Sequence, residues 1–78
     1  MTQIKDRIKK ERFIEYELYA LLNGIDSNIG NVTAYVDINC NDVTQVCVKY
    51  FDGREVKVNV ECDSLPAIVI DVVRKLFY

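Results

Sequence analysis

The 78 residues contain no histidine and no tryptophan, a single proline and only three cysteines. Because histidine is the usual general base near pH 7 and the commonest metal ligand, its absence argues against Ser/His or Cys/His nucleophilic catalysis. The cysteines, Cys40, Cys47 and Cys62, form an odd set without a Cys-x-x-Cys pair, so reduced thiols are expected rather than a disulfide framework. With no catalytic constellation, metal motif or nucleotide loop, the sequence predicts a protein that is not an enzyme and binds no cofactor or metal.

Long apolar runs are also missing. No stretch approaches the roughly 18 residues that cross a bilayer, and the first residues, MTQIKD, contain no signal-peptide core. A cytoplasmic protein without membrane contact is therefore expected. Half of the residues are hydrophobic and 28% are charged, which is typical of a globular chain, and the length predicts one domain over residues 1–78.

Three runs in which apolar and polar residues alternate lie between residues 32 and 62, and they predict three β-strands. The even-numbered apolar residues of the first and third runs form one inward face: Val32, Ala34, Val36, Ile38, Val56, Val58, Val60 and Cys62. The second run, about residues 43–51, is ambiguous, because Val46/Val48/Tyr50 and Val43/Cys47/Phe51 could each form its core face.

Register decides between these two faces, because residues opposite each other in an antiparallel pair point to the same side of the sheet. A three-residue loop at 51–53 with Gly53 in the left-handed conformation aligns Val48 with Val56 and Lys49 with Glu55. The same test on residues 40–42 aligns Val36 with Val46 and Ala34 with Val48. A three-stranded antiparallel meander is predicted.

Two stretches with helical spacing flank the strands. The first, about residues 3–22, gathers Ile14, Leu18, Leu21 and Leu22 on one face, with Ile25 folding back onto it beyond Asn23-Gly24, while Phe13 and Tyr16 lie nearly opposite. The second begins at a cap on Asp63 or Ser64, has Pro66 in its first turn, and buries Leu65, Ile68, Val69, Val72, Val73 and Leu76. The predicted fold is α+β, a two-layer α-β-β-β-α arrangement with both helices packed on one face of the meander.

Charge is unevenly distributed along the chain. Residues 5–12 carry five basic side chains against two acidic ones, a net charge of +3, whereas the rest of the chain carries −5. A basic cluster attracts phosphate or an acidic partner, although charged turns beyond a core are also commonly just solvated. The candidate phosphate-binding residues are Lys5, Arg7, Lys9, Lys10 and Arg12.

A second cluster of charge is acidic. The meander brings Asp37, Asp42, Glu61 and Asp63 near one end of the sheet, where an acidic edge could meet a basic groove on another protein. Their spacing does not resemble a calcium loop. Exposed aromatic side chains on a helix commonly form interfaces, so Phe13 and Tyr16 join these four carboxylates as candidate partner-binding residues.

The open face of the sheet is expected to place Tyr35, Cys47 and Lys57 side by side. A neighbouring lysine lowers the pKa of a thiol, so Cys47 is a candidate reactive cysteine. An enzymatic function would depend on this thiol or on the acidic cluster.

The order helix, three-stranded meander, helix covers nearly the whole chain and resembles the double-stranded-RNA-binding domain. That family contacts phosphates with lysines at the start of its second helix. Here the corresponding stretch is Asp63-Ser64-Leu65-Pro66-Ala67-Ile68, and the first lysine after it is Lys75. The resemblance therefore implies the fold and not RNA binding by that mode.

The chain is also similar to the small acidic inhibitors made by phages and mobile elements, anti-CRISPR proteins among them. The likeness rests on size, a net charge of −2, the missing catalytic set, and carboxylates that could imitate nucleic-acid phosphates. It implies a non-enzymatic module that blocks a surface of a partner protein, such as a nucleic-acid-binding complex. The alternatives are direct nucleic-acid binding through the basic helix start and a small adaptor that dimerises through Phe13 and Tyr16.

Overall fold

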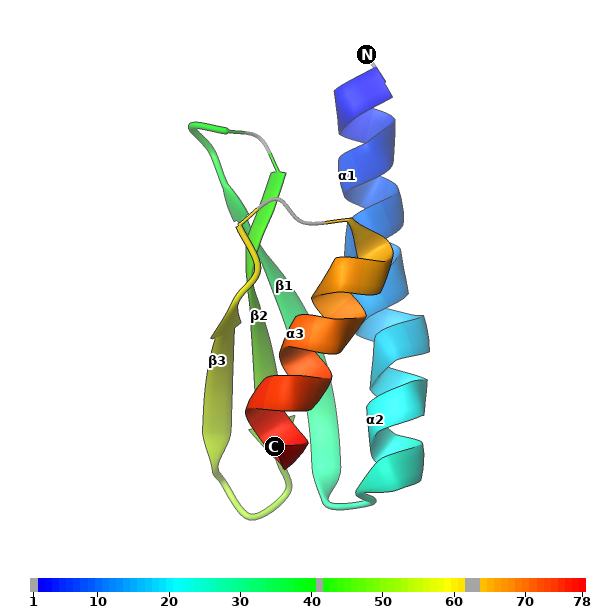
Figure 1. The fold of residues 1–78 in the computed structure, drawn as a ribbon, viewed down its shortest axis with the longest axis vertical. Helices are drawn as coiled ribbons and strands as arrows, with labels where there is room; N and C mark the ends of the chain where they lie inside the picture. Colours follow the sequence, from blue (N-terminus) through cyan, green and yellow to red (C-terminus); the bar gives the residue numbers. More distant parts are fainter. Residues whose placement is uncertain (1, 41, 62–63) are drawn as a thin grey trace.

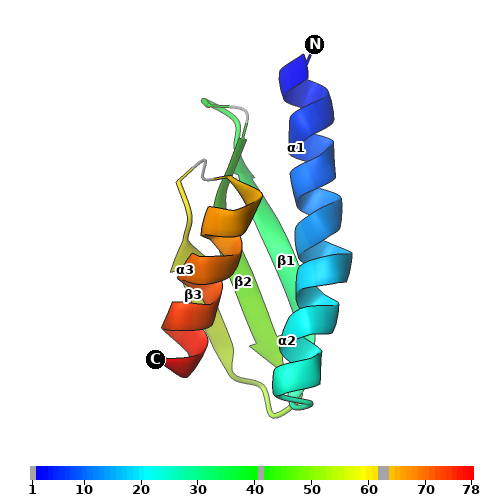
Figure 2. The same cartoon turned by 45° about the vertical axis from the view of Figure 1, so that its right-hand side comes forward.

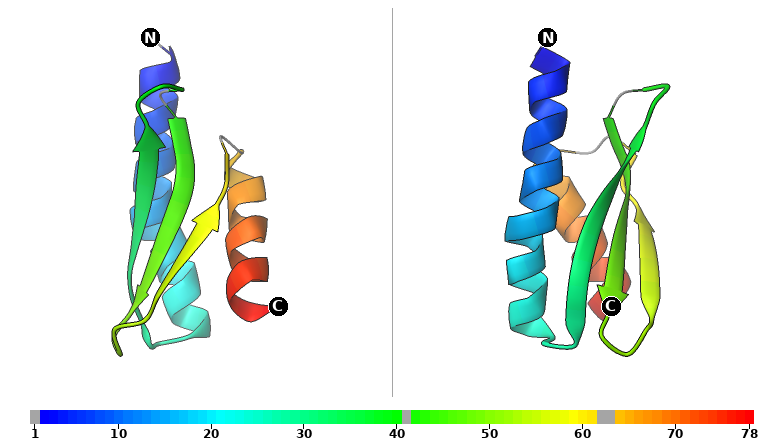
Figure 3. Two further views of the ribbon diagram at one scale, coloured as in Figure 1. Left: turned by 90° about the vertical axis from the view of Figure 1, so that its left-hand side faces the viewer. Right: turned by 180° about the vertical axis from the view of Figure 1, so that it is seen from behind.

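The computed structural model describes residues 2–40, 42–61 and 64–78, and it confirms the predicted order of helix, three-stranded antiparallel meander and C-terminal helix (Figure 1). The N-terminal helix comprises α1 (Thr2–Arg12), η1 (Phe13–Leu18) and α2 (Tyr19–Ile25). The strands are β1 (Ile29–Asp37), β2 (Asp42–Tyr50) and β3 (Glu55–Asn59), and α3 (Leu65–Phe77) follows them. The N-terminal helix and α3 cover the same face of the sheet, and the start of α1 projects beyond the sheet (Figures 2 and 3). None of the described helices is both long and apolar enough to cross a membrane.

A π-helical segment, η1, sits in the middle of the N-terminal helix and packs on β1. The buried residues of this helix, Ile14, Leu18 and Leu22, are all 0% exposed and are spaced four apart. On a regular α-helix such a stripe rotates by about 40° per step. The i→i+5 bonds of a π-helix put more residues in each turn, so η1 reduces that rotation and keeps the three side chains over the sheet.

The predicted end of the first helix is wrong. The helix continues through Gly24 to Ile25, with Asp26 as its C-cap. Ile25 therefore stays on the helix and is 56% exposed, and Leu21 is 47% exposed, although both were assigned to the core. The turn into β1 is held instead by polar groups: the Asn23 side chain donates to the Ile29 carbonyl at 2.9 Å, and Asp26 accepts from the Asn28 N–H at 3.0 Å.

The second hairpin has the predicted register. Val48 pairs with Val56, Val46 with Val58, and Lys49 with Glu55. Gly53 has φ 97°, and the Tyr50 N–H donates to the Arg54 carbonyl at 2.9 Å across the three-residue loop. A residue with a Cβ is strained at this φ, which is why the loop takes glycine there.

The first hairpin differs from the prediction by two residues. Ala34 pairs with Val46 and Val32 with Val48, and a β-bulge then leaves Thr44 as an extra residue before Val36 pairs with Val43. The bulge reverses the side-chain parity of β2, so Val43 and Val46 are both fully buried. The backbone carbonyl of the bulged residue, Thr44, accepts hydrogen bonds from the N–H groups of Val60 at 3.0 Å and Glu61 at 3.2 Å.

Because the first strand ends at Asp37, Ile38 lies in the connection and is 92% exposed, so its assignment to the core is wrong. The remaining even-numbered residues face the helices as predicted, with Cys62 outside the described residues. On α3, Ile68 and Val72 are buried, and the predicted Val69, Val73 and Leu76 pack partly buried against the core. Ser64 is the N-cap residue, and its carbonyl accepts the Ile68 N–H at 2.9 Å.

Candidate functional site

A shallow hollow lies where the N-terminal helix passes the start of α3. Its lining residues come from α1, η1 and α3: Lys9, Arg12, Phe13, Tyr16, Glu17 and Leu65. Phe13 is partly buried against the core, and Tyr16 is 68% exposed. The basic and aromatic residues, which the sequence suggested for two different kinds of partner, thus form one surface, here called the helix-one hollow.

Helical geometry explains why these side chains come together. Positions three and four apart lie on one face of a helix, and Lys9, Arg12, Phe13 and Tyr16 follow that spacing. Leu65 of α3 lines the same hollow as Phe13, while Tyr16 stays largely open to solvent. The site is an exposed aromatic ring next to two cations, with one carboxylate, Glu17, at the same surface.

The side chain of Lys10 points away from the helix-one hollow and contacts the sheet. Its Nζ donates to both carboxylate oxygens of Asp42, at 2.9 and 3.1 Å. The two side chains are only 16% and 27% exposed, so water screens this pair less than a surface ion pair. Asp42 is also the cross-strand partner of Asp37, and like charges directly opposite are destabilising. Lys10 therefore offsets a repulsion inside the sheet and fixes α1 to β2.

The other predicted phosphate-binding residues have separate surroundings. Lys9 and Arg12 are exposed, and Arg7 lies 3.8 Å from Glu11, one helical turn away. The side chain of Lys5 lies outside what the structure describes. Among the members whose side chains the structure describes, Lys9 and Arg12 line the helix-one hollow.

Of the predicted acidic cluster, the structure brings Asp37 and Asp42 together, and Glu61 follows β3 at the same end, bonded through its N–H to Thr44. Asp37 accepts the Asn39 N–H at 2.8 Å, and Glu61 accepts the Asn59 side-chain amide at 2.9 Å. Asp63 lies outside the described residues. Within the described ranges, no group of three or more His, Cys, Asp or Glu side chains could hold a metal ion.

Cys47 lies on the sheet face away from the helices, with Thr33 and Lys57 as its cross-strand partners. The sequence predicts an open, activated thiol, but Cys47 is only 1% exposed. Burial raises the pKa of the thiol, and a hydrogen bond with Glu55 raises it further, which outweighs the lowering effect of Lys49 and Lys57. The expectation that Lys57 makes Cys47 reactive is therefore wrong.

No known family model, no curated protein and no solved structure matches this chain. The order of elements alone resembles the double-stranded-RNA-binding domain. Any function has to be inferred from the surfaces of the chain itself.

The Lys10–Asp42 pair should stabilise the fold measurably. We expect Lys10→Met to lower the free energy of unfolding by about 1 kcal/mol, with a coupling energy of about 0.5–1 kcal/mol in the double variant. Asp42→Asn should cost less, because it also removes the repulsion with Asp37. Urea unfolding of the four proteins measures both quantities. The exposed pair Lys49–Glu55, 3.9 Å apart, is the matched control and should show a smaller coupling. Equal couplings for the two pairs would contradict a structural role for Lys10.

Proposed function

We propose that this protein is a non-enzymatic protein-binding module that inhibits a partner by occupying one of its surfaces. The observation that carries the proposal is the helix-one hollow, in which an exposed tyrosine lies beside an arginine and a lysine. Tyrosine and arginine are enriched among the residues that dominate binding energy at protein interfaces. The hollow is also lined by a partly buried aromatic ring, Phe13.

The acidic end of the sheet supports binding less well than the hollow does. Asp42 is already neutralised by Lys10, and Asp37 and Glu61 accept local hydrogen bonds. A carboxylate whose charge is offset at 2.9 Å is a poorer imitation of a nucleic-acid phosphate. We therefore place the main contact at the hollow, and leave Asp37, Glu61 and Asp63 a secondary role in steering a basic partner.

The protein would belong to the small inhibitors made by phages and mobile elements. The likeness to inhibitors from phages and mobile elements, including anti-CRISPR proteins, rests on small size, a net charge of −2, the missing catalytic set and the carboxylates. A partner that handles nucleic acid would suit this class.

Affinity capture from the source cell tests the proposal. We compare the immobilised wild-type protein with the hollow variant Arg12→Glu/Tyr16→Ala and with Lys49→Glu/Tyr35→Ala, a control that makes the same change in charge and also removes one tyrosine, on exposed residues of the sheet. One protein species should be captured by the wild type and the control in nuclease-treated extract and lost, by at least about tenfold, with the hollow variant. Equal capture by the hollow variant, with far-UV circular dichroism showing it folded, would overturn the assignment.

Nucleic-acid binding is the second candidate, because single-stranded nucleic acid is bound where aromatic rings lie beside cations. Lys9, Arg12 and Tyr16 provide that combination. An oligonucleotide shift whose affinity falls steeply with salt concentration would favour this function over the first, since phosphate contacts release counterions. A salt-insensitive or absent shift would remove it.

A further inference from the structure

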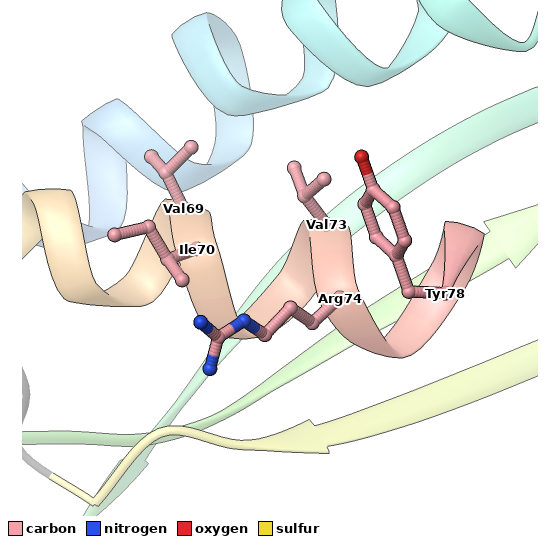
Figure 4. Close-up of a pocket in the computed structure, with 5 residues that line it drawn as sticks. All are labelled: Val69, Ile70, Val73, Arg74 and Tyr78. Carbon is pink, nitrogen blue, oxygen red and sulfur yellow. The ribbon is translucent and has the colours of Figure 1, made fainter.

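One flank of α3, beside the face that packs on the core, carries an apolar groove that the sequence pattern did not single out. It is lined by Val69, Ile70, Val73, Arg74 and Tyr78 (Figure 4). Ile70 on α3 is 51% exposed, and Tyr78, the C-cap residue that follows the helix, is 96% exposed, which is high for two large side chains with apolar surface. Figure 4 shows Val69, Val73 and Tyr78 projecting to one side of α3, while the guanidinium of Arg74 reaches back along the helix towards Ile70.

Positive charge gathers at the edge of this groove. Arg74 also lines a second hollow, which lies between α3 and β3 and contains Lys57, Asn59, Asp71 and Lys75. Neither Arg74 nor Lys75 forms an ion pair with any other residue in the ranges that the structure covers. Arg74 therefore lines both hollows, with Lys75 next to it and one carboxylate, Asp71, nearby. Lys57 is partly neutralised, because its Nζ lies 3.9 Å from the Glu55 carboxylate.

We infer that the α3 groove binds an acidic amphipathic helix of a partner protein. Apolar side chains at i, i+3, i+4 and i+7 of such a helix would cover Val69, Ile70 and Val73, which is the usual way in which a helix occupies a hydrophobic groove. An adjacent carboxylate would pair with Arg74, whose planar guanidinium can form two parallel hydrogen bonds with it. Charge complementarity selects an acidic helix over a basic one, because a basic one would face Arg74 and Lys75, neither of which is neutralised by an ion pair within the described residues.

The α3 groove and the helix-one hollow are different surfaces. The hollow reaches α3 only at Leu65, its first residue, whereas the groove starts at Val69 and extends past the end of the helix. A protein with both surfaces could hold two segments of one partner, or two partners, at the same time. Binding at the groove does not depend on the proposed function of the hollow.

Fluorescence anisotropy with designed probe peptides tests the inference. The acidic probe is a fluorescein-labelled 14-residue peptide with leucine at i, i+3, i+4 and i+7 and glutamate at the flanking positions. One matched probe replaces every glutamate by lysine, and another replaces every leucine by serine. We expect the wild-type protein to bind the acidic leucine probe at least about tenfold more tightly than either matched probe.

Variants locate the binding. Arg74→Glu and Ile70→Ser should each weaken the acidic probe by about tenfold, and Arg74→Glu should improve binding of the lysine probe. The hollow variant Arg12→Glu/Tyr16→Ala should bind the acidic probe like the wild type, so failure of the proposed function and failure of the groove give different results. The inference is overturned if the acidic probe does not bind, if Arg74→Glu leaves its binding unchanged, or if vesicles of anionic phospholipid bind the groove and the peptide does not.

Discussion

Replacing Leu18 by alanine is expected to lower the free energy of unfolding by about 2–5 kcal/mol, the usual cost of removing a large aliphatic side chain from a closed core. Leu18 is 0% exposed and is the middle member of the stripe that η1 holds against β1. A domain of this size rarely has more than about 3–5 kcal/mol of stability. The variant should therefore be largely unfolded at 25 °C, which circular dichroism and urea titration measure directly.

Two neighbouring changes provide the controls. Glu17→Ala removes an exposed side chain from the adjacent position and should change stability by less than about 0.5 kcal/mol. Leu18→Met conserves volume and should cost less than about 1.5 kcal/mol. A Leu18→Ala protein as stable as Glu17→Ala would mean that η1 does not pack against the sheet.

The large features of the fold could be predicted because each depends on a local pattern. Alternation with period two specifies which residues of a strand share a face, and Asp52-Gly53 specifies a tight loop, so the β2–β3 register follows from residues close together in the chain. Ile68 and Val72 likewise follow from helical spacing, with Pro66 marking the first turn.

The first hairpin could not be predicted in the same way, because its register depends on a contact from elsewhere. The bulge at Thr44 is stabilised by the N–H groups of Val60 and Glu61, which belong to the chain after β3. No sequence pattern within residues 32–50 predicts that the N–H groups of Val60 and Glu61 will bind there. The π-helical turn is similar, since it is favoured by packing of Ile14, Leu18 and Leu22 on β1 and not by a residue type in η1.

The candidate site was predicted in parts and not as a whole. Residues that lie close together in one helix, such as Arg12 and Tyr16, can be grouped from the sequence. Lys10 and Asp42 are 32 positions apart, and no pattern links them. One residue in the sequence indicated the groove on α3. Ile70 is apolar but lies on the helix face predicted to be exposed to solvent, next to Asp71 and Arg74.

Cys47 should react with a thiol reagent only when the protein unfolds. In a Cys40→Ser/Cys62→Ser variant, the remaining thiol is 1% exposed, and burial together with Glu55 raises its pKa. We expect its modification by a disulfide reagent at pH 8 to be about 10²- to 10³-fold slower than in 6 M urea, because opening to the unfolded state limits the reaction. The matched variant that keeps only Cys40, which is exposed, should show little difference between the two conditions. Equally fast modification of native Cys47 would contradict this, and would return the thiol to consideration as a reactive group.

The raised pKa of Cys47 also predicts how stability changes with pH. The folded protein holds the thiol proton more tightly than the unfolded chain, in which cysteine ionises near about 8.5. The stability that this difference contributes is therefore fully present below pH 8.5, and it is lost as the pH rises from there through the higher pKa of the folded state. Urea unfolding of the Cys40→Ser/Cys62→Ser protein should give a free energy that falls between pH 8 and pH 10. Adding Cys47→Ala should make this fall shallower, since the group whose ionisation opposes folding is then gone; an unchanged slope would mean that other residues cause the alkaline loss.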